Sequence, residues 1–290
     1  MRASAVRLGS SELAAAGGSR TRPWLAAAML AWREILRFFR QGSRVVGAIG
    51  QPLTLWLFFS AGFEGTFQLE GPAATASFAQ FYFPGTLVLI LLFTAIFATI
   101  SVIEDRNEGF LQSVLVAPIP RWSMVLGKVS GGALLAILQG SLFLLISLTW
   151  GVSFPPSKLF ALGGLMLLTA IALTSLGFLI AWRMESTQGF HAIMTVFLMP
   201  LWLLSGAFFP VPPLTAGGSW TQLVLHGVMR ANPLTYSVAG IHQLLFDGPL
   251  AAGLFMPSLA VCWWVTIAFA LSMFGVATWS ARGACRGNPT

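Results

Sequence analysis

The feature that most limits what this chain can fold into is a set of six long apolar segments. Each is close to the ~20 residues that an α-helix needs to cross ~30 Å of hydrocarbon, and none contains Asp, Glu, Lys or Arg. A charge at the centre of such a helix would cost ~2.5–3.5 kcal/mol on a membrane-insertion scale. The segments are Val45–Phe63, Tyr82–Ile103, Val129–Trp150, Leu159–Trp182, Phe190–Phe209 and Pro257–Ser280. We therefore predict an all-α membrane protein with six transmembrane helices.

The scarcity of charge supports the same conclusion. Only 9% of the 290 residues are charged, whereas a soluble globular domain carries roughly 25%. Such a chain could not cover its surface with polar groups, so lipid must serve as its solvent, and a soluble enzyme is excluded. Alternating strands of about ten residues are absent, which argues against an outer-membrane barrel.

The basic residues predict the orientation. All 16 Lys and Arg except Lys158 and Arg230 fall on one side of the six-span topology. The positive-inside rule places that side, with both termini, in the cytoplasm, and a bacterial inner membrane is the expected location. This collar facing anionic lipid accounts for the net charge of +7 without a nucleic-acid partner. Residues 1–23, which lack the apolar core of a signal peptide, are expected to be a disordered cytoplasmic tail.

The segment 24–40 has two stripes at helical spacing. Leu25, Met29, Trp32 and Leu36 are among its apolar positions, and a basic stripe lies about a quarter-turn away. A helix of this kind is typical of the membrane interface. The expected interfacial residues are Trp32, Arg33, Arg37 and Arg40. Further along, the apolar stretches Trp220–Met229 and Pro233–Phe246 predict short re-entrant helices before the last span.

The chain offers little chemistry of its own. No G-x-x-x-x-G-K-[ST] loop is present to cradle ATP phosphates, and no span carries the acid that ion-coupled transporters place near the midplane. His242 and Asp247 fit H-x-x-x-x-D, a spacing seen in lipid acyltransferases, but the pattern falls on the outer side and is weak. Neither a catalytic residue, a metal site nor a bound cofactor is expected, so the chain is interpreted as a passive path that borrows energy.

Some polar and small residues lie inside the spans. Gly132, Ala136 and Gly140 form a stripe that lets helix backbones approach closely, and packing against a neighbouring span is favoured over a dimer interface. For Gln51 and Gln139, hydrogen bonds between helices are favoured over contact with a transported molecule.

The segment 104–128 carries the sharpest signal. It is interpreted as a cytoplasmic loop, with acids at the end of one span, an apolar turn at 110–117, and two prolines before the bases that open the next span. A solvated loop of mixed charge is the simple interpretation. The apolar turn, however, would sit poorly in free water, and a partner surface would explain it.

Four motifs in order resemble one family. The pattern E-D-R-x-E-G-x-L-x-x-x-x-x-A-P-I-P-R-x-x-x-x-x-x-K from Glu104 to Lys128 resembles the ATP-binding-cassette exporter permeases of the second type. The helix at 24–40 is similar to their connecting helix. Leu203–Pro210 resembles their S-G-x-x-F-P signature, and Asn232–Tyr236 their N-P-x-x-Y signature. The resemblance covers about residues 24–282, the expected permease domain, and leaves 283–290 as a second cytoplasmic tail.

The resemblance implies roles for particular residues. Those expected to couple the chain to an ATPase subunit are Glu104, Arg106, Glu108, Gly109, Pro118, Arg121 and Lys128. The signature residues are Ser205, Gly206, Pro210, Asn232, Pro233 and Tyr236. ATP and Mg²⁺ would bind only to that separate subunit, and two permease copies would pair, as a homodimer by expectation.

The resemblance also implies a function. A drug- or antibiotic-like amphiphilic or hydrophobic cargo would be exported, because the chain is compact and its spans offer aromatic side chains but no fixed charge. A polysaccharide or glycolipid exporter of the same family is the first alternative. An ion-coupled secondary transporter, an intramembrane acyltransferase and a non-transporting membrane anchor are the alternatives from other classes.

Overall fold

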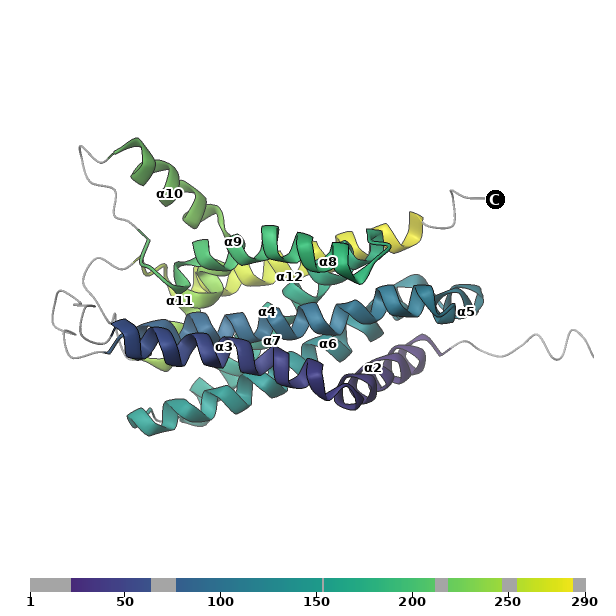
Figure 1. Cartoon of the computed structure of the whole chain (residues 1–290), viewed down its shortest axis with the longest axis horizontal. Coiled ribbons are helices and arrows are strands. Elements are labelled where there is room, and N and C mark those ends of the chain that lie inside the picture. Colours follow the sequence, from purple (N-terminus) through teal and green to yellow (C-terminus); the bar gives the residue numbers. More distant parts are fainter. Residues whose placement is uncertain (1–21, 64–76, 153, 212–218, 247–254, 284–290) are drawn as a thin grey trace, which may run out of the picture.

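A computed structural model of the chain describes residues 22–63, 77–152, 154–211, 219–246 and 255–283. Within these ranges every regular element is a helix (Figure 1). The long helices are α2 Pro23–Arg40, α3 Gly42–Phe63, α4 Phe78–Asn107, α6 Arg121–Leu144, α7 Pro156–Arg183 and α12 Leu259–Gly283. The shorter ones are α5 Phe110–Val116, η1 Leu145–Trp150, α8 Thr187–Ile193, η2 Met194–Leu198, α9 Met199–Trp202, η3 Leu203–Ala207, α10 Trp220–Ala231 and α11 Pro233–Leu245.

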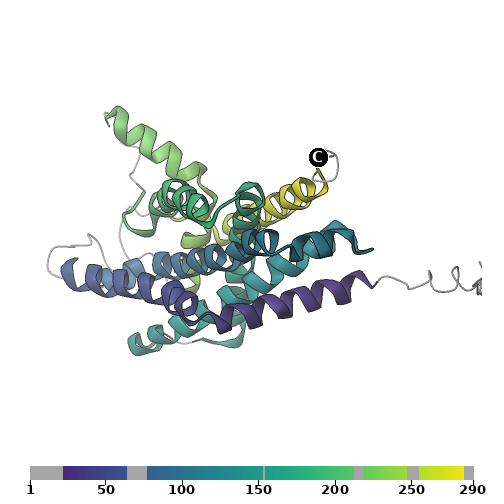
Figure 2. The ribbon, with the colours of Figure 1, turned by 45° about the vertical axis from the view of Figure 1, so that its right-hand side comes forward.

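Six helices are long and apolar enough to cross a membrane, which confirms the predicted fold class. They are Gly42–Phe63, Phe78–Asn107, Arg121–Trp150, Pro156–Arg183, Thr187–Ala207 and Leu259–Arg282. Figures 1 and 2 show them running along one common direction as a bundle. The tail at 1–21, the stretch 64–76 and Asp247 of the H-x-x-x-x-D pattern lie outside the described residues.

Helix α4 forms the centre of this bundle. Its mean hydropathy of 2.7 is the highest of the six, and α3, α6 and α7 pack around it. A helix that is apolar on all sides is expected to be buried. The hydroxyls of Thr86 and Thr99 are satisfied within the helix by donating to carbonyls of the preceding turn at 2.9–3.1 Å.

Small residues let the helices approach α4 and each other. A Cβ added at Gly132 would lie 2.7 Å from Thr174, and one at Gly140 would lie 2.9 Å from Met166. Both neighbours belong to α7 of the same chain, which confirms packing within the chain. The Gln139 side chain accepts a hydrogen bond from Thr94 at 2.5 Å, which confirms the predicted bond between helices.

The fifth span departs from a regular helix. It consists of α8, the π-helical η2, the short α9 and the π-helical η3, which contains Gly206 in the left-handed region at φ 76°. π-Helical turns widen the helix and concentrate at functional sites. Sequence periodicity predicted one plain helix here, because a single inserted residue changes the hydrogen-bond pattern without changing the apolar composition.

The two short helices before the last span are present as predicted. Helix α11 packs against α7, α12 and η3 and is mostly buried. Helix α10 projects from the bundle in Figure 1 and exposes Trp220 and Leu223. Their depth in a membrane stays a prediction.

Candidate functional site: a charge cluster at one end of the bundle

Helix α2 packs alongside α6 and also contacts α4 at one end of the bundle (Figures 1 and 2). It presses on two glycines of α6: a Cβ at Gly127 would lie 2.7 Å from Leu30, and one at Gly131 would lie 2.9 Å from Glu34. Backbone carbonyls of α2 lie almost as close. Only glycine permits this approach without a shift of the helices. The two glycines of α6 therefore allow α2 to pack closely against the bundle.

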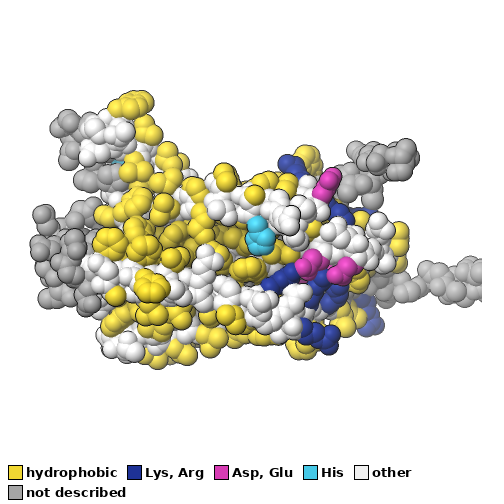
Figure 3. Space-filling model, in the orientation of Figure 1, with side chains coloured by type: hydrophobic (Ala, Val, Ile, Leu, Met, Phe, Trp, Pro, Cys, Tyr) yellow, Lys and Arg dark blue, Asp and Glu magenta, His cyan; other side chains and the backbone are white. Residues whose placement is uncertain are grey.

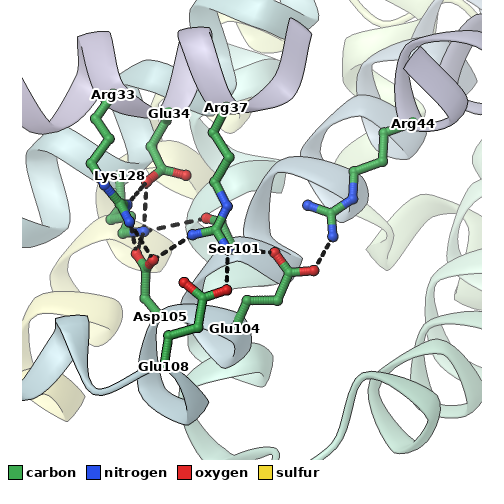
Figure 4. A network of polar contacts seen from close by, with 9 residues as sticks. All are labelled: Arg33, Glu34, Arg37, Arg44, Ser101, Glu104, Asp105, Glu108 and Lys128. Atoms are coloured by element: carbon green, nitrogen blue, oxygen red, sulfur yellow. Dashed lines mark hydrogen bonds and ion pairs between the residues drawn. The ribbon is translucent and has the colours of Figure 1, made fainter. Parts of the chain in front are cut away.

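Charged side chains gather at this end of the bundle. On the face shown in Figure 3, Lys, Arg, Asp and Glu side chains lie near α2 and α5, while apolar side chains cover the middle and the other end. We call this the charged end. Eight residues there, which we call the charge cluster, connect α2 and α3 to α4 and α6 (Figure 4): Arg33, Glu34, Arg37, Arg44, Glu104, Asp105, Glu108 and Lys128.

Asp105 is the centre of the charge cluster. Its carboxylate is fully buried and accepts two hydrogen bonds from Arg33, at 2.8 and 3.0 Å. Arg37 and Lys128 also donate to it. A buried carboxylate is tolerated only when its charge and lone pairs are satisfied. Here three cations from two other helices satisfy them, so Asp105 links α4 to both α2 and α6.

The remaining pairs extend this link. Lys128 is buried and donates to Glu34 at 2.6 Å. Arg37 bonds Glu104 at 2.9 Å and the exposed Glu108 at 3.1 Å, and Arg44 also pairs with Glu104. Four acids thus face four bases, and the cluster is electrically neutral.

Arg33 is held in its charged form. Burial disfavours the guanidinium charge, but the hydrogen bonds and charge of Asp105 outweigh it and raise the pKa of Arg33 above its ordinary value. Its guanidinium also lies 3.7 Å from the ring centre of Phe110 on α5, a cation–π contact. The cluster therefore reaches α5 as well.

The segment 104–128 was predicted to be a loop, and this prediction is wrong because most of the segment is helical. Helix α4 continues to Asn107, α5 occupies Phe110–Val116, and α6 begins at Arg121. The sharp turn between α4 and α5 needs Gly109, whose φ of 76° places it in the left-handed region. Helix α5 is too short for its periodicity to be recognised in the sequence, and its apolar side rests on the bundle through the buried Leu111.

The structure separates the seven predicted coupling residues into two groups. Glu104, Glu108 and Lys128 lie within the charge cluster, and Arg106 donates to the carbonyls of Met184, at 3.0 Å, and Trp182 at the end of α7. Outside the cluster, Pro118 is exposed, while Gly109 and Arg121 are half-buried. Their coupling role stays a prediction. The exposed side of α5 adds Gln112, Ser113 and Val116, which the sequence did not single out.

The basic stripe of α2 was predicted to face the membrane interface, but most of it faces other helices of the chain. Trp32 is exposed, as expected of an interfacial residue. Arg33 and Arg37, however, point to the acids of α4, and of the three arginines predicted for the interface only Arg40 is exposed. The stripe was identified correctly, but its partners lie about 70 residues away and leave no local signal. Glu34 gave one overlooked clue, because it is an acid on the otherwise apolar buried face of α2.

The signature residues meet at the opposite end of the bundle. Asn232 caps α11 by accepting from the Leu234 amide at 3.0 Å and donates to the Leu201 carbonyl in the fifth span. Pro233 opens α11, and the Tyr236 hydroxyl donates to the Arg230 carbonyl at 3.0 Å. Buried Ser205 and half-buried Gly206 lie in η3, and exposed Pro210 follows it. These residues build the corner that joins the fifth span to α11.

The comparison with known families gives one match over most of the chain. A family model described as "ABC-2 type transporter" matches residues 26–246. That range contains most of α2, the whole charge cluster, α5 and both signature motifs.

Three relatives illustrate the similarity. A chain named as a transport permease, ycf38, of Cyanophora paradoxa is 27% identical over 219 residues, 74% of this chain and 72% of that one. Nodulation protein J of Sinorhizobium fredii is 27% identical over 246 residues, 83% of this chain and 89% of that one. A chain of Escherichia coli named "Probable multidrug ABC transporter permease YbhR" is 29% identical over 133 residues, 45% of this chain and 36% of that one.

Proposed function

This chain belongs to the ABC-2 type transporter family, and we propose that it is the permease of an exporter driven by ATP hydrolysed on a separate subunit. The family makes it a membrane-spanning transport permease with an ATPase partner. The observation that carries the proposal is the family match over 26–246. It agrees with the six membrane-long helices and with the charged end, where α5 is tied to α2 and α4.

We place the ATPase subunit on α5. This helix follows α4 after a two-residue turn, and its side chain Val116 is 85% exposed. An apolar side chain so exposed on a polar end of the molecule fits a partner surface better than free water. Pro118 adjoins it and is also exposed. A movement of the ATPase subunit against α5 would be transmitted to α4 through the Arg33–Phe110 contact and the charge cluster.

The remaining features of the proposal follow from charge and family. The charged end faces the cytoplasm of a bacterial inner membrane, with both termini on that side, by the positive-inside rule. A second copy of the chain completes the path. The cargo is amphiphilic or hydrophobic, because the six charge-free segments offer a small hydrated anion no counter-charge. Trp56, Phe93 and Trp202 are buried in helix packing, so the cargo would meet other side chains.

The docking surface can be tested at Val116. Replacing Val116 by Asp should reduce co-purification of the ATPase subunit about tenfold or more, because a charge desolvated at the centre of an interface commonly costs 2 kcal/mol or above. The measurement is the amount of ATPase recovered with an affinity-tagged permease, together with ATP hydrolysis in vesicles.

The matched control is Val228→Asp on α10, an exposed valine at the opposite end of the bundle. It should leave ATPase recovery unchanged. Equal recovery with Val116→Asp and Val228→Asp would show that α5 is not the docking surface.

The cargo class can be tested in cells. Deleting the gene should raise sensitivity to several lipophilic cationic or neutral drugs, and a plasmid copy should restore resistance. A polysaccharide or glycolipid cargo is the second candidate, because the relatives of Cyanophora paradoxa and Sinorhizobium fredii, which align over most of the chain, are not named for drugs. Unchanged drug sensitivity together with loss of a surface glycan would reject the drug cargo in favour of this second candidate.

A further inference from the structure

A groove of about 740 Å³ runs along the exposed face of α2 at the charged end. One side is apolar, formed by Met29, Trp32 and Leu36. The other is basic, formed by Arg33, Arg37 and Arg40. The volume is within the ~300–1,000 Å³ of small-molecule sites. The groove therefore offers both halves of an amphiphile a surface of matching polarity.

The groove carries a net positive charge because Arg40, unlike Arg33 and Arg37, is not neutralised by an acid of the described residues. Within the described residues, Arg33 and Arg37 are paired with acids of the charge cluster, which is neutral as a whole. Glu108, the acid that lines the groove, already accepts from Arg37. Arg40 is exposed, and in the part of the chain that the structure describes it forms no ion pair. Arg40 thus adds an uncompensated positive charge to the rim.

The apolar side of the groove exposes more large apolar side chains than a surface in contact with water would be expected to expose. Met29, Trp32 and Leu36 are 60%, 56% and 41% exposed, and they follow one another along the same face of α2 at helical spacing. Large apolar side chains aligned beside arginines match the membrane interface, where the apolar face enters the acyl region and the cations stay at the headgroups. The groove therefore suits a lipid better than a soluble ligand.

We infer that this groove binds an anionic phospholipid of the leaflet on the charged side, with its phosphate at Arg40 and its acyl chains along Met29, Trp32 and Leu36. Spare donors of Arg33 and Arg37 border the same space, and guanidinium groups bind phosphate well. Phe110 and Glu108 line the groove from α5 and the turn before it. The bound lipid consequently touches the helix to which we assign ATPase docking, although its binding does not depend on that assignment.

The test uses the quenching of Trp32 by brominated lipids. The full chain and its Trp32→Phe variant are reconstituted into phosphatidylcholine vesicles that contain either dibrominated phosphatidylglycerol or dibrominated phosphatidylcholine at the same fraction. The difference between chain and variant isolates Trp32. We expect dibrominated phosphatidylglycerol to be preferred about fivefold, from the ~1 kcal/mol that one basic residue contributes near an anionic surface.

Two substitutions locate the site. Arg40→Gln should bring the preference at Trp32 close to one, whereas Arg183→Gln, which removes another exposed arginine at the end of α7, should leave it unchanged. Equal quenching by both lipids in the unsubstituted chain would overturn the inference and indicate an ordinary lipid annulus. A preference that survives Arg40→Gln would also overturn it, as would loss of ATPase co-purification in Arg40→Gln without any change in quenching, since the groove would then be a protein interface.

Discussion

Replacing Asp105 by Ala is expected to destabilise the protein by about 3–5 kcal/mol, because it leaves buried cations without their shared carboxylate. Arg33, Arg37 and Lys128 all donate to Asp105. Lys128 is buried and, among the described residues, would retain only Glu34 and Ser101 as partners. The measurement is the midpoint of unfolding in a mixed micelle titrated with a denaturing detergent.

Two companion variants make this prediction specific. Glu108→Gln removes an acid of the same cluster that is largely exposed, and should change stability by less than about 1 kcal/mol. Removing Asp105 and Lys128 together, as Asp105→Leu with Lys128→Met, should recover part of the loss, since replacing a buried ion pair by apolar groups is often nearly neutral. If Asp105→Ala were no more harmful than Glu108→Gln, the cluster would not hold α2 on the bundle.

Replacing Gly85 by Ala is expected to destabilise the protein by about 1–3 kcal/mol through overpacking. A Cβ at Gly85 would lie 2.5 Å from the Cβ of Ala207 and 2.6 Å from its carbonyl oxygen, so α4 and the fifth span would have to separate. Such a shift would also strain the hydrogen bond of 2.8 Å that the Trp202 indole donates to the Gly85 carbonyl. The same detergent titration measures the effect.

Gly163 supplies the control. It lies within α7, and a Cβ there would meet no atom within 4 Å. Gly163→Ala should therefore stabilise the protein slightly, by up to ~1 kcal/mol, because alanine loses less backbone entropy than glycine in a helix. Equal effects of alanine at the two positions would mean that α4 and the fifth span are not in close contact.

The sequence predicted those parts of the fold that depend on apolar composition. Each of the six spans was found because hydrocarbon excludes charge from ~20 consecutive residues, a rule that acts locally. Gly132 and Gln139 were interpreted correctly for the same reason: a small or polar residue inside a span needs a neighbouring helix of some kind. The rule does not say which neighbour, and Thr174 and Thr94 could be identified only in the structure.

The candidate site was predicted less completely. The acids at 104–108 and the arginines of α2 were both noticed, yet one group was interpreted as facing a partner protein and the other as facing lipid. The structure pairs them with each other across 67 to 72 residues of sequence. Charge pairing over such a separation depends on how helices cross, which periodicity does not encode. The π-helical turns of the fifth span were missed for a similar reason, since one shifted hydrogen bond leaves no compositional trace.

The contrast between α4 and the fifth span has a mechanical consequence. Helix α4 is one uninterrupted helix of 30 residues, about 45 Å long, and it is clamped along its length by α3, α6 and α7. A continuous helix packed on several sides in this way is expected to resist bending. The fifth span alternates two short α-helices, α8 and α9, with the π-helical segments η2 and η3, and kinks in helices concentrate at such π turns. A displacement of α4 at Asp105 would therefore also move Gly85, where α4 contacts the more flexible fifth span. The strain would be taken up by the fifth span, near Ala207.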